Sequence, residues 1–202
     1  SEAGVDLVVT AYRGRPVESA WWRVAPNPTY REGETYAVLR DGLARVKGDR
    51  YLRRAEESPE DSALDRVTRE TIWMVVTPRW RRHLERFVVR ERPDAVIVFT
   101  VPMAHFRGIA THLRERFGIP VAFYDGDVPM SLPEFGGMDT GFNYYHGADP
   151  SEYDLLFSNS EGGAERLVQL GARQVEPVMW GADPEFFRPL DVPKEHDVFF
   201  YG

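Results

Sequence analysis

The residues with the clearest chemical potential are two aspartates separated by one glycine, Asp125-Gly126-Asp127. They follow the apolar run 119–124, which has the composition of a buried strand. Two carboxylates at this spacing can share a cation, bind the hydroxyl groups of a ligand, or act as a general base. The alternative is structural: one aspartate caps a turn, and Gly126 supplies a positive φ angle. The sequence leaves both interpretations open.

Two histidines stand in loops where they can act on a ligand. His105 comes after the apolar run 95–99, at the start of a predicted helix whose positive end favours binding of a hydroxyl or phosphate group. The alternative is a half-exposed histidine that only caps this helix. His146 lies in a long loop beside Tyr144 and Tyr145, which can stack on a ligand or anchor the loop.

Strands that alternate with helices must position these residues. Apolar runs predict buried strands at 5–12 and 95–99, and further strands at 119–124, 155–157 and 175–179. Helical spacing of apolar residues predicts helices at 35–46, 59–75, 77–88, 106–117 and 160–168. Thr77 is expected to cap its helix before Pro78, Gly118 to end one, and Val67 and Val75 to face inward. The alternation is typical of an α/β fold with a Rossmann-like open parallel sheet and helices on both faces.

In an open parallel sheet, ligands bind beyond the carboxyl ends of the strands. This rule selects the loops at 12–16, 100–105, 125–131, 159–163 and 180–183. Ser160 precedes a glycine-rich helix start whose free N–H groups can hold an anionic or hydroxylated ligand, although a serine cap is common there. Together with His146, the candidate ligand-binding residues are therefore Tyr12, Arg13, Gly14, Asn159, Ser160 and Trp180.

The composition indicates one globular domain and excludes several classes of protein. The chain has 202 residues, a net charge of −7 and 43% hydrophobic residues. The negative charge argues against nucleic acid as a partner, while the arginines between Arg79 and Arg92 leave contact with a membrane surface open. Without cysteine there is no disulfide or thiolate chemistry, and no apolar run approaches the ~20 residues that span a bilayer. We therefore expect a cytoplasmic protein.

The last quarter of the chain resembles a known family. A strand at 154–158 runs into Asn159-Ser160, a helix ended by Gly171, a strand at 175–179, and then Gly181-Ala182-Asp183-Pro184-Glu185-Phe186-Phe187-Arg188-Pro189. This series is similar to the hinge between the halves of GT-B glycosyltransferases, above all the family-4-type and CgeB-like (spore-maturation) enzymes. The resemblance extends over roughly 93–202 and is specific in this hinge segment. It implies an acceptor-side domain at 1–190, followed at 191–202 by the hinge and the first strand of a missing donor-binding domain.

The resemblance implies an enzyme that moves a sugar from a nucleotide-diphosphate-sugar to an acceptor hydroxyl, with His105, Asp125 and Asp127 as candidates for the base. The nucleotide-sugar is a co-substrate held mainly by the missing domain, so this chain alone would turn over nothing. No metal or other cofactor is expected, because helix N-termini and basic side chains can offset the charge of the leaving diphosphate. Two alternatives stay open: a non-catalytic Rossmann-like domain that binds a sugar or a partner, and a metal-dependent GT-A-like transferase using Asp125 and Asp127.

Overall fold

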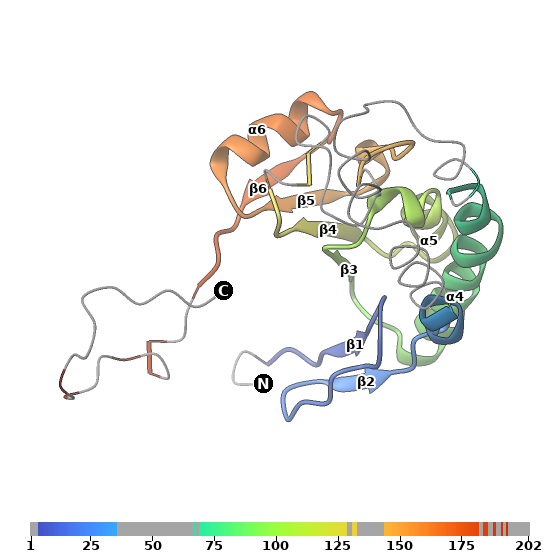
Figure 1. The fold of residues 1–202 in the computed structure, drawn as a ribbon, viewed down its shortest axis with the longest axis horizontal. Coiled ribbons are helices and arrows are strands. Elements are labelled where there is room, and N and C mark those ends of the chain that lie inside the picture. Colours follow the sequence, from blue (N-terminus) through green and yellow to red (C-terminus); the bar gives the residue numbers. More distant parts are fainter. Residues whose placement is uncertain are drawn as a thin grey trace, which may run out of the picture.

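The computed structural model describes residues 4–35, 67, 69–128, 131–132, 144–181, 184–185, 188, 191 and 193. At its centre is a sheet of four parallel strands, in the order β3 (Val96–Phe99), β4 (Val121–Asp125), β5 (Leu155–Ser158) and β6 (Val175–Pro177). Helices lie between these strands in the sequence and pack on the sheet (Figure 1). The predicted α/β class with a Rossmann-like open parallel sheet is confirmed.

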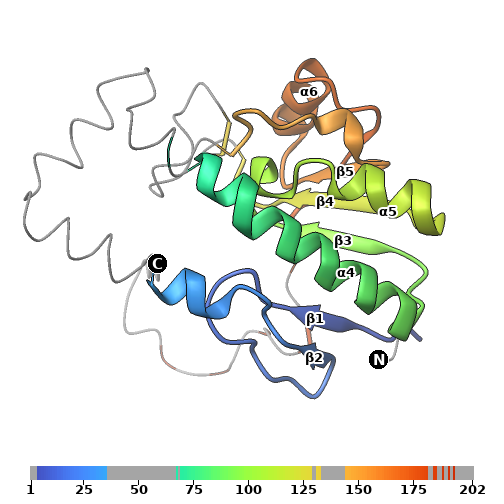
Figure 2. The ribbon, with the colours of Figure 1, turned by 90° about the vertical axis from the view of Figure 1, so that its right-hand side faces the viewer.

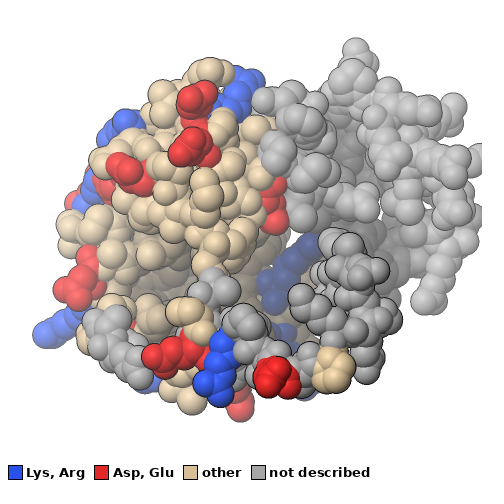
Figure 3. Space-filling view, turned by 90° about the vertical axis from the view of Figure 1, so that its left-hand side faces the viewer, with Lys and Arg blue, Asp and Glu red and all other residues tan. Residues whose placement is uncertain are grey.

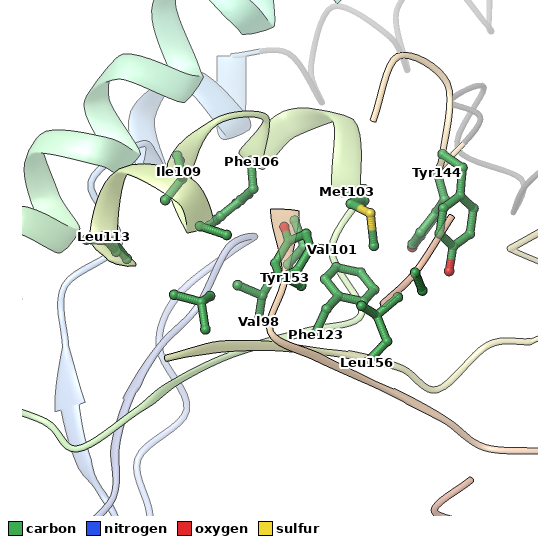
Figure 4. Close-up of a cluster of buried hydrophobic side chains, with 14 of the residues drawn as sticks. Val98, Val101, Met103, Phe106, Ile109, Leu113, Phe123, Tyr144, Tyr153 and Leu156 are labelled. Atoms are coloured by element: carbon green, nitrogen blue, oxygen red, sulfur yellow. The ribbon is translucent and has the colours of Figure 1, made fainter. Parts of the chain in front are cut away.

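A row of side chains across the sheet forms the centre of the core. Val98, Phe123 and Leu156 are paired in register on neighbouring strands, and their exposed fractions are 7%, 0% and 0%. Tyr153 packs edge-on against Phe123, with ring centroids 5.3 Å apart, and Figure 4 shows both in the cluster between sheet and helices. Burial of each such side chain contributes about 1.5–3 kcal/mol. This face of the sheet therefore carries much of the stability of the fold.

Three described helices cover this face of the sheet: α4 (Thr77–Glu91), α5 (Ile109–Phe117) and α6 (Glu161–Gln169). Figure 2 shows α4 and α5 in front of β3 and β4. Trp80, Leu84 and Val88 recur at one helical turn and place one stripe of α4 in the core. Leu113 of α5 and Leu167 of α6 are fully buried in the same cluster.

Two predicted helix boundaries are confirmed. Gly118 follows α5 with φ 68°, in the left-handed region that favours glycine, and its N–H donates to the Arg114 carbonyl oxygen. Ser160 caps α6, because its Oγ accepts a hydrogen bond from the Gly163 N–H at 3.1 Å. Both signals are local, so the sequence alone was sufficient to place them.

The opposite face of the sheet carries no helix in the part of the chain that the structure describes. Ile97 and Phe99, which flank Val98 along β3, are 60% and 51% exposed. Figure 3 views the molecule from this side, where most of the described surface is uncharged. The connections from β3 to β6 all step in one direction along the sheet, and right-handed crossovers in one direction lie on one face. The described helices therefore form a single layer, whereas the sequence predicts helices on both faces of the sheet.

A second sheet consists of two parallel strands, β1 (Val8–Thr10) and β2 (Arg23–Ala25). It lies beyond β3, on the side away from β6 (Figures 1 and 2). The sequence pattern does not predict β2, whose apolar run is too short to stand out. The prediction that the first strand is buried is wrong: Leu7 and Val9 are 44% and 38% exposed, because this strand pairs only with β2 and not with the main sheet.

The predicted helix start at Thr77 is also wrong. A π-helical segment, η1 (Ile72–Val76), runs into α4 without a break, and Thr77 has helical angles, φ −56° and ψ −48°. Its Oγ1 donates to the His105 carbonyl oxygen at 2.8 Å instead of capping a helix. The wide π turn explains how Pro78 is tolerated inside a continuous helix. A proline lacks an N–H and crowds the preceding turn, and a π bulge relieves both problems.

The π segment also changes which residues face inward. Val67 and Val75, predicted to be inward, are 62% and 37% exposed. Val75 lies inside the π segment, where the extra residue per turn shifts the helix out of its regular period. Residues 30–35 are helical, but most of the helix predicted at 35–46 and all of the strand predicted at 197–202 lie outside the described residues. Within the described residues, no helix has the length and apolar character needed to cross a bilayer.

Candidate functional site

The strand ends bring most of the predicted site residues to one edge of the molecule. Tyr12 follows β1, His105 lies in the 3-10 helix η2 (Met103–Phe106) after β3, and Asp125 ends β4. Since β3 and β4 are parallel neighbours, their carboxyl ends lie at the same edge of the main sheet, where ligands bind in open sheets. Two hydrogen bonds join residues that end or follow different strands, including Asn159, which comes directly after β5. The Asn159 N–H donates to the Asp125 carbonyl oxygen at 3.3 Å, and the Tyr12 hydroxyl oxygen lies 2.5 Å from His105 Nδ1.

Asp125 is fully buried and serves as an anchor for the loop that follows β4. Its Oδ2 accepts hydrogen bonds from Ser131 Oγ, at 2.5 Å, and from the Tyr145 hydroxyl. Its Oδ1 accepts the Asp127 N–H at 3.0 Å, which is the turn-capping role that the sequence left open. Burial, reinforced by the Asp125 charge, raises the pKa of Tyr145, so this hydroxyl keeps its proton and donates.

Gly126 is needed for space and not for a positive φ angle. Its φ is not among the positive values of the described glycines. A Cβ at this position would lie 2.6 Å from Trp180 Cζ2. The carbonyl oxygen of Gly126 accepts hydrogen bonds from Asn159 Nδ2 at 2.8 Å and from Trp180 Nε1 at 3.4 Å. Asn159 and Trp180, predicted to bind a ligand, thus hold the turn between the two aspartates.

Asp127 differs from Asp125 in its surroundings. It is half-buried, and among the described residues no group donates a hydrogen bond to its carboxylate. Burial, and then the negative charge of Asp125, raises the pKa of Asp127 above its ordinary value. A carboxylate with a raised pKa is a stronger proton acceptor, which is the property of a general base.

Tyr12 and His105 form a hydrogen-bonded pair at this edge. Burial, and then the charge of Arg13, lowers the pKa of His105 to about 4, so the ring is neutral at neutral pH. Tyr12 also packs against Trp80 and Phe106, with ring centroids 5.7 and 5.8 Å away. A neutral, hydrogen-bonded imidazole can hold a hydroxyl group, but it is a weak base.

Tyr144 connects the segment after β3, which contains Ala104, with the segment after β4, which contains Asp127. Its carbonyl oxygen accepts the Ala104 N–H at 3.3 Å, and the side chain is 6% exposed. Burial raises the pKa of Tyr144; the charges of Asp127 and Asp125 add to this, and Arg13 opposes it. From the sequence, Tyr144 was predicted only to stack on a ligand or to anchor its loop. Its position in a long loop was the one sequence feature that pointed to the site. We refer below to the carboxyl-edge cluster, which consists of Tyr12, Arg13, His105, Asp127 and Tyr144.

The remaining predicted residues lie outside this cluster. Ser160 caps α6. Gly14 has φ 68° and shapes the loop after β1. His146 is exposed beside Gly147, where a Cβ would lie 3.0 Å from Trp73. Within the described ranges, no group of three or more His, Cys, Asp or Glu residues is arranged to hold a metal ion.

Comparison with known proteins does not assign a function to these residues. No protein-family model, curated protein or solved structure matches the chain significantly. The chemistry of the carboxyl-edge cluster must therefore be argued from its own residues.

Proposed function

We propose that this chain is the acceptor-side domain of a GT-B-type glycosyltransferase. The observation that carries the proposal is the Asp127 carboxylate, which has no hydrogen-bond donor among the described residues and stands at the carboxyl edge of an open parallel sheet. That edge is where open α/β sheets bind ligands. The hinge-like series at 154–189 supports the same assignment through its resemblance to GT-B enzymes.

Asp127 is the proposed general base. It takes the proton of the acceptor hydroxyl while the hydroxyl oxygen bonds to the anomeric carbon of the donor sugar. The bond from that carbon to the nucleoside diphosphate breaks, and the diphosphate leaves with the electron pair. Asp125 positions Asp127 through its hydrogen bond to the Asp127 N–H. Tyr12 and His105 hold an acceptor hydroxyl, and the donor is bound mainly by a second domain.

Saturation-transfer NMR with a panel of neutral monosaccharides tests the acceptor site. We expect at least one sugar to bind the wild-type chain, and Asp127→Ala to weaken that binding at least about fivefold, the loss of one charge-assisted hydrogen bond. Asp94→Ala is the matched control, because Asp94 is exposed just before β3, at the opposite edge of the sheet. The proposal fails if no sugar binds, or if Asp127→Ala binds as well as the wild type.

A non-catalytic sugar-binding domain is the second candidate. It is favoured by the engagement of Asp125 and of His105 Nδ1 by side chains of the protein itself. The conservative change Asp127→Asn separates the two candidates in the longer protein that the proposal predicts. If Asp127 is the base, Asp127→Asn keeps sugar binding but abolishes the release of nucleoside diphosphate. The second candidate predicts no release from the wild type either.

The proposal also predicts that divalent cations do not alter sugar binding. A metal-dependent transferase would use Asp125 as a ligand, but both of its carboxylate oxygens already accept hydrogen bonds. Divalent cations require several free oxygen ligands. Titration of the chain with Mn²⁺, followed by EDTA, should leave the saturation-transfer signal unchanged. A saturation-transfer signal that appears only with Mn²⁺ would favour a metal-dependent GT-A-like transferase instead.

A further inference from the structure

Arg13 is exposed in the loop after β1 and makes no hydrogen bond or ion pair with any residue of the described chain. Its charge nevertheless acts on buried neighbours. It opposes the effect of burial on the pKa of Tyr12 and of Tyr144, and it adds to the effect of burial on the pKa of His105. The geometry agrees with this, because Arg13 directly follows Tyr12, whose hydroxyl oxygen lies 2.5 Å from His105 Nδ1. Ala104, the residue before His105, donates its N–H to the Tyr144 carbonyl oxygen at 3.3 Å.

The loop that carries Arg13 is fixed to the core by a chain of hydrogen bonds. Trp80 Nε1 donates to Thr29 Oγ1 at 3.0 Å, and Thr29 Oγ1 donates to Asn27 Oδ1 at 3.2 Å. Asn27 Nδ2 then donates to the carbonyl oxygens on either side of Arg13, at 3.1 and 3.2 Å. Trp80 and Thr29 are 2% and 5% exposed. A side chain on such a fixed loop loses less freedom when it binds a ligand.

Asp127 is joined to the segment of Tyr144 through Asp125, which accepts hydrogen bonds from the Asp127 N–H and from the hydroxyl of Tyr145, the residue after Tyr144. The negative charge of Asp127 raises the pKa of Tyr144, and the positive charge of Arg13 opposes this. They form no ion pair with each other among the described contacts. A neutral ligand would satisfy Asp127 through its hydroxyl groups and leave Arg13 without a partner. A planar guanidinium is suited to bind a carboxylate or phosphate through two hydrogen bonds. A ligand with both an anionic group and hydroxyl groups would satisfy both residues.

We propose that the acceptor bound at the carboxyl-edge cluster is an anionic sugar, that is, a sugar that bears a carboxylate or phosphate group. Arg13 holds the anionic group, while Asp127 and Tyr144 face the hydroxyl groups. This inference rests on the proposed function and narrows its substrate class. The diphosphate of the donor is a different anion, and the test separates the two.

Titration of the chain with four probes provides the test: glucuronate, glucose 6-phosphate, glucose and uridine diphosphate. At least one acidic sugar should bind about tenfold or more tightly than glucose, the effect of hydrogen bonds to a charged group. Comparison of glucuronate with glucose 6-phosphate shows which anion is preferred. Uridine diphosphate should not displace either sugar.

Arg13→Gln should remove the preference for acidic sugars, so that glucuronate and glucose 6-phosphate bind this variant no more tightly than glucose does. Arg15→Gln is the matched control, because Arg15 lies in the same exposed loop and its Nε donates to the Tyr30 hydroxyl at 3.3 Å. That control should keep the preference of the wild type. Because both arginines are exposed, neither change should disturb folding, and circular dichroism checks this.

Three outcomes overturn the inference. Equal affinity for glucose and the acidic sugars, or an unchanged preference in Arg13→Gln, rejects it and leaves the proposed function standing. Displacement of the acidic sugar by uridine diphosphate assigns Arg13 to the donor and also rejects it. If no sugar of any kind binds, both the inference and the proposed function are rejected.

Discussion

At the scale of single residues, Asp125 and Asp127 are close in sequence and opposite in environment. Asp125 is 0% exposed and accepts three hydrogen bonds, while Asp127 accepts none from the described residues. Hydrogen bonds to a buried charge contribute about 1.5–3 kcal/mol each. We therefore expect Asp125→Ala to lower the free energy of unfolding by about 3 kcal/mol or more, and Asp127→Ala by less than about 0.5 kcal/mol. Urea unfolding measures both, and equal losses would contradict the assignment of an anchor and a base.

His105 gives a second prediction at this scale, for the dependence of stability on pH. Its pKa falls from the ordinary value of 6.5 to about 4 in the folded protein, through burial and then Arg13. Between these values the unfolded chain binds a proton that the folded chain does not, so acidification through this window should cost up to about 3 kcal/mol.

The variant His105→Asn isolates this contribution. Asparagine does not titrate, and its Oδ1 can still accept a hydrogen bond from the Tyr12 hydroxyl. Its free energy of unfolding, measured at pH 7.0, 5.5 and 4.5, should fall less steeply than that of the wild type. Parallel slopes would show that His105 is not the group responsible.

At the scale of elements, the first turn of α6 contains two glycines with different surroundings. A Cβ at Gly163 would lie 2.2 Å from Val128 Cγ1 and 2.5 Å from Ser158 Oγ, while a Cβ at Gly162 meets nothing within 4 Å. Gly162→Ala should raise the free energy of unfolding by about 0.5–1 kcal/mol through helix propensity. Gly163→Ala should lower it by about 1–3 kcal/mol through overpacking. Stabilisation by both changes would mean that the contact with Val128 yields easily.

At the scale of the whole molecule, the main sheet has one face under helices and one face without a described helix. Val98 faces the helices at 7% exposed, and its neighbour Ile97 faces away at 60%. Val98→Thr keeps the shape and buries a hydroxyl group, so it should cost about 1–3 kcal/mol. Ile97→Thr should cost less than about 1 kcal/mol, since exposed substitutions have small effects. Similar costs, measured by thermal unfolding, would show that the second face is also covered.

The sequence by itself determined the features that depend on neighbours along the chain. The apolar runs located β3, β4 and β5 to within a few residues. Gly118 and Ser160 located helix boundaries, because a left-handed angle and a side-chain cap are requirements of a single turn. The alternation of these elements was enough for the α/β class and for the edge at which the polar residues gather.

Only the tertiary structure decided what each polar residue does. Asp125 and Asp127 have the same side chain, and contacts from Ser131 and Tyr145 make one of them an anchor. Tyr12 and His105 are 93 positions apart in the sequence, so no local pattern reveals their hydrogen bond. Burial and charge, which set the pKa of a side chain, are produced by residues that the fold brings together from distant parts of the chain.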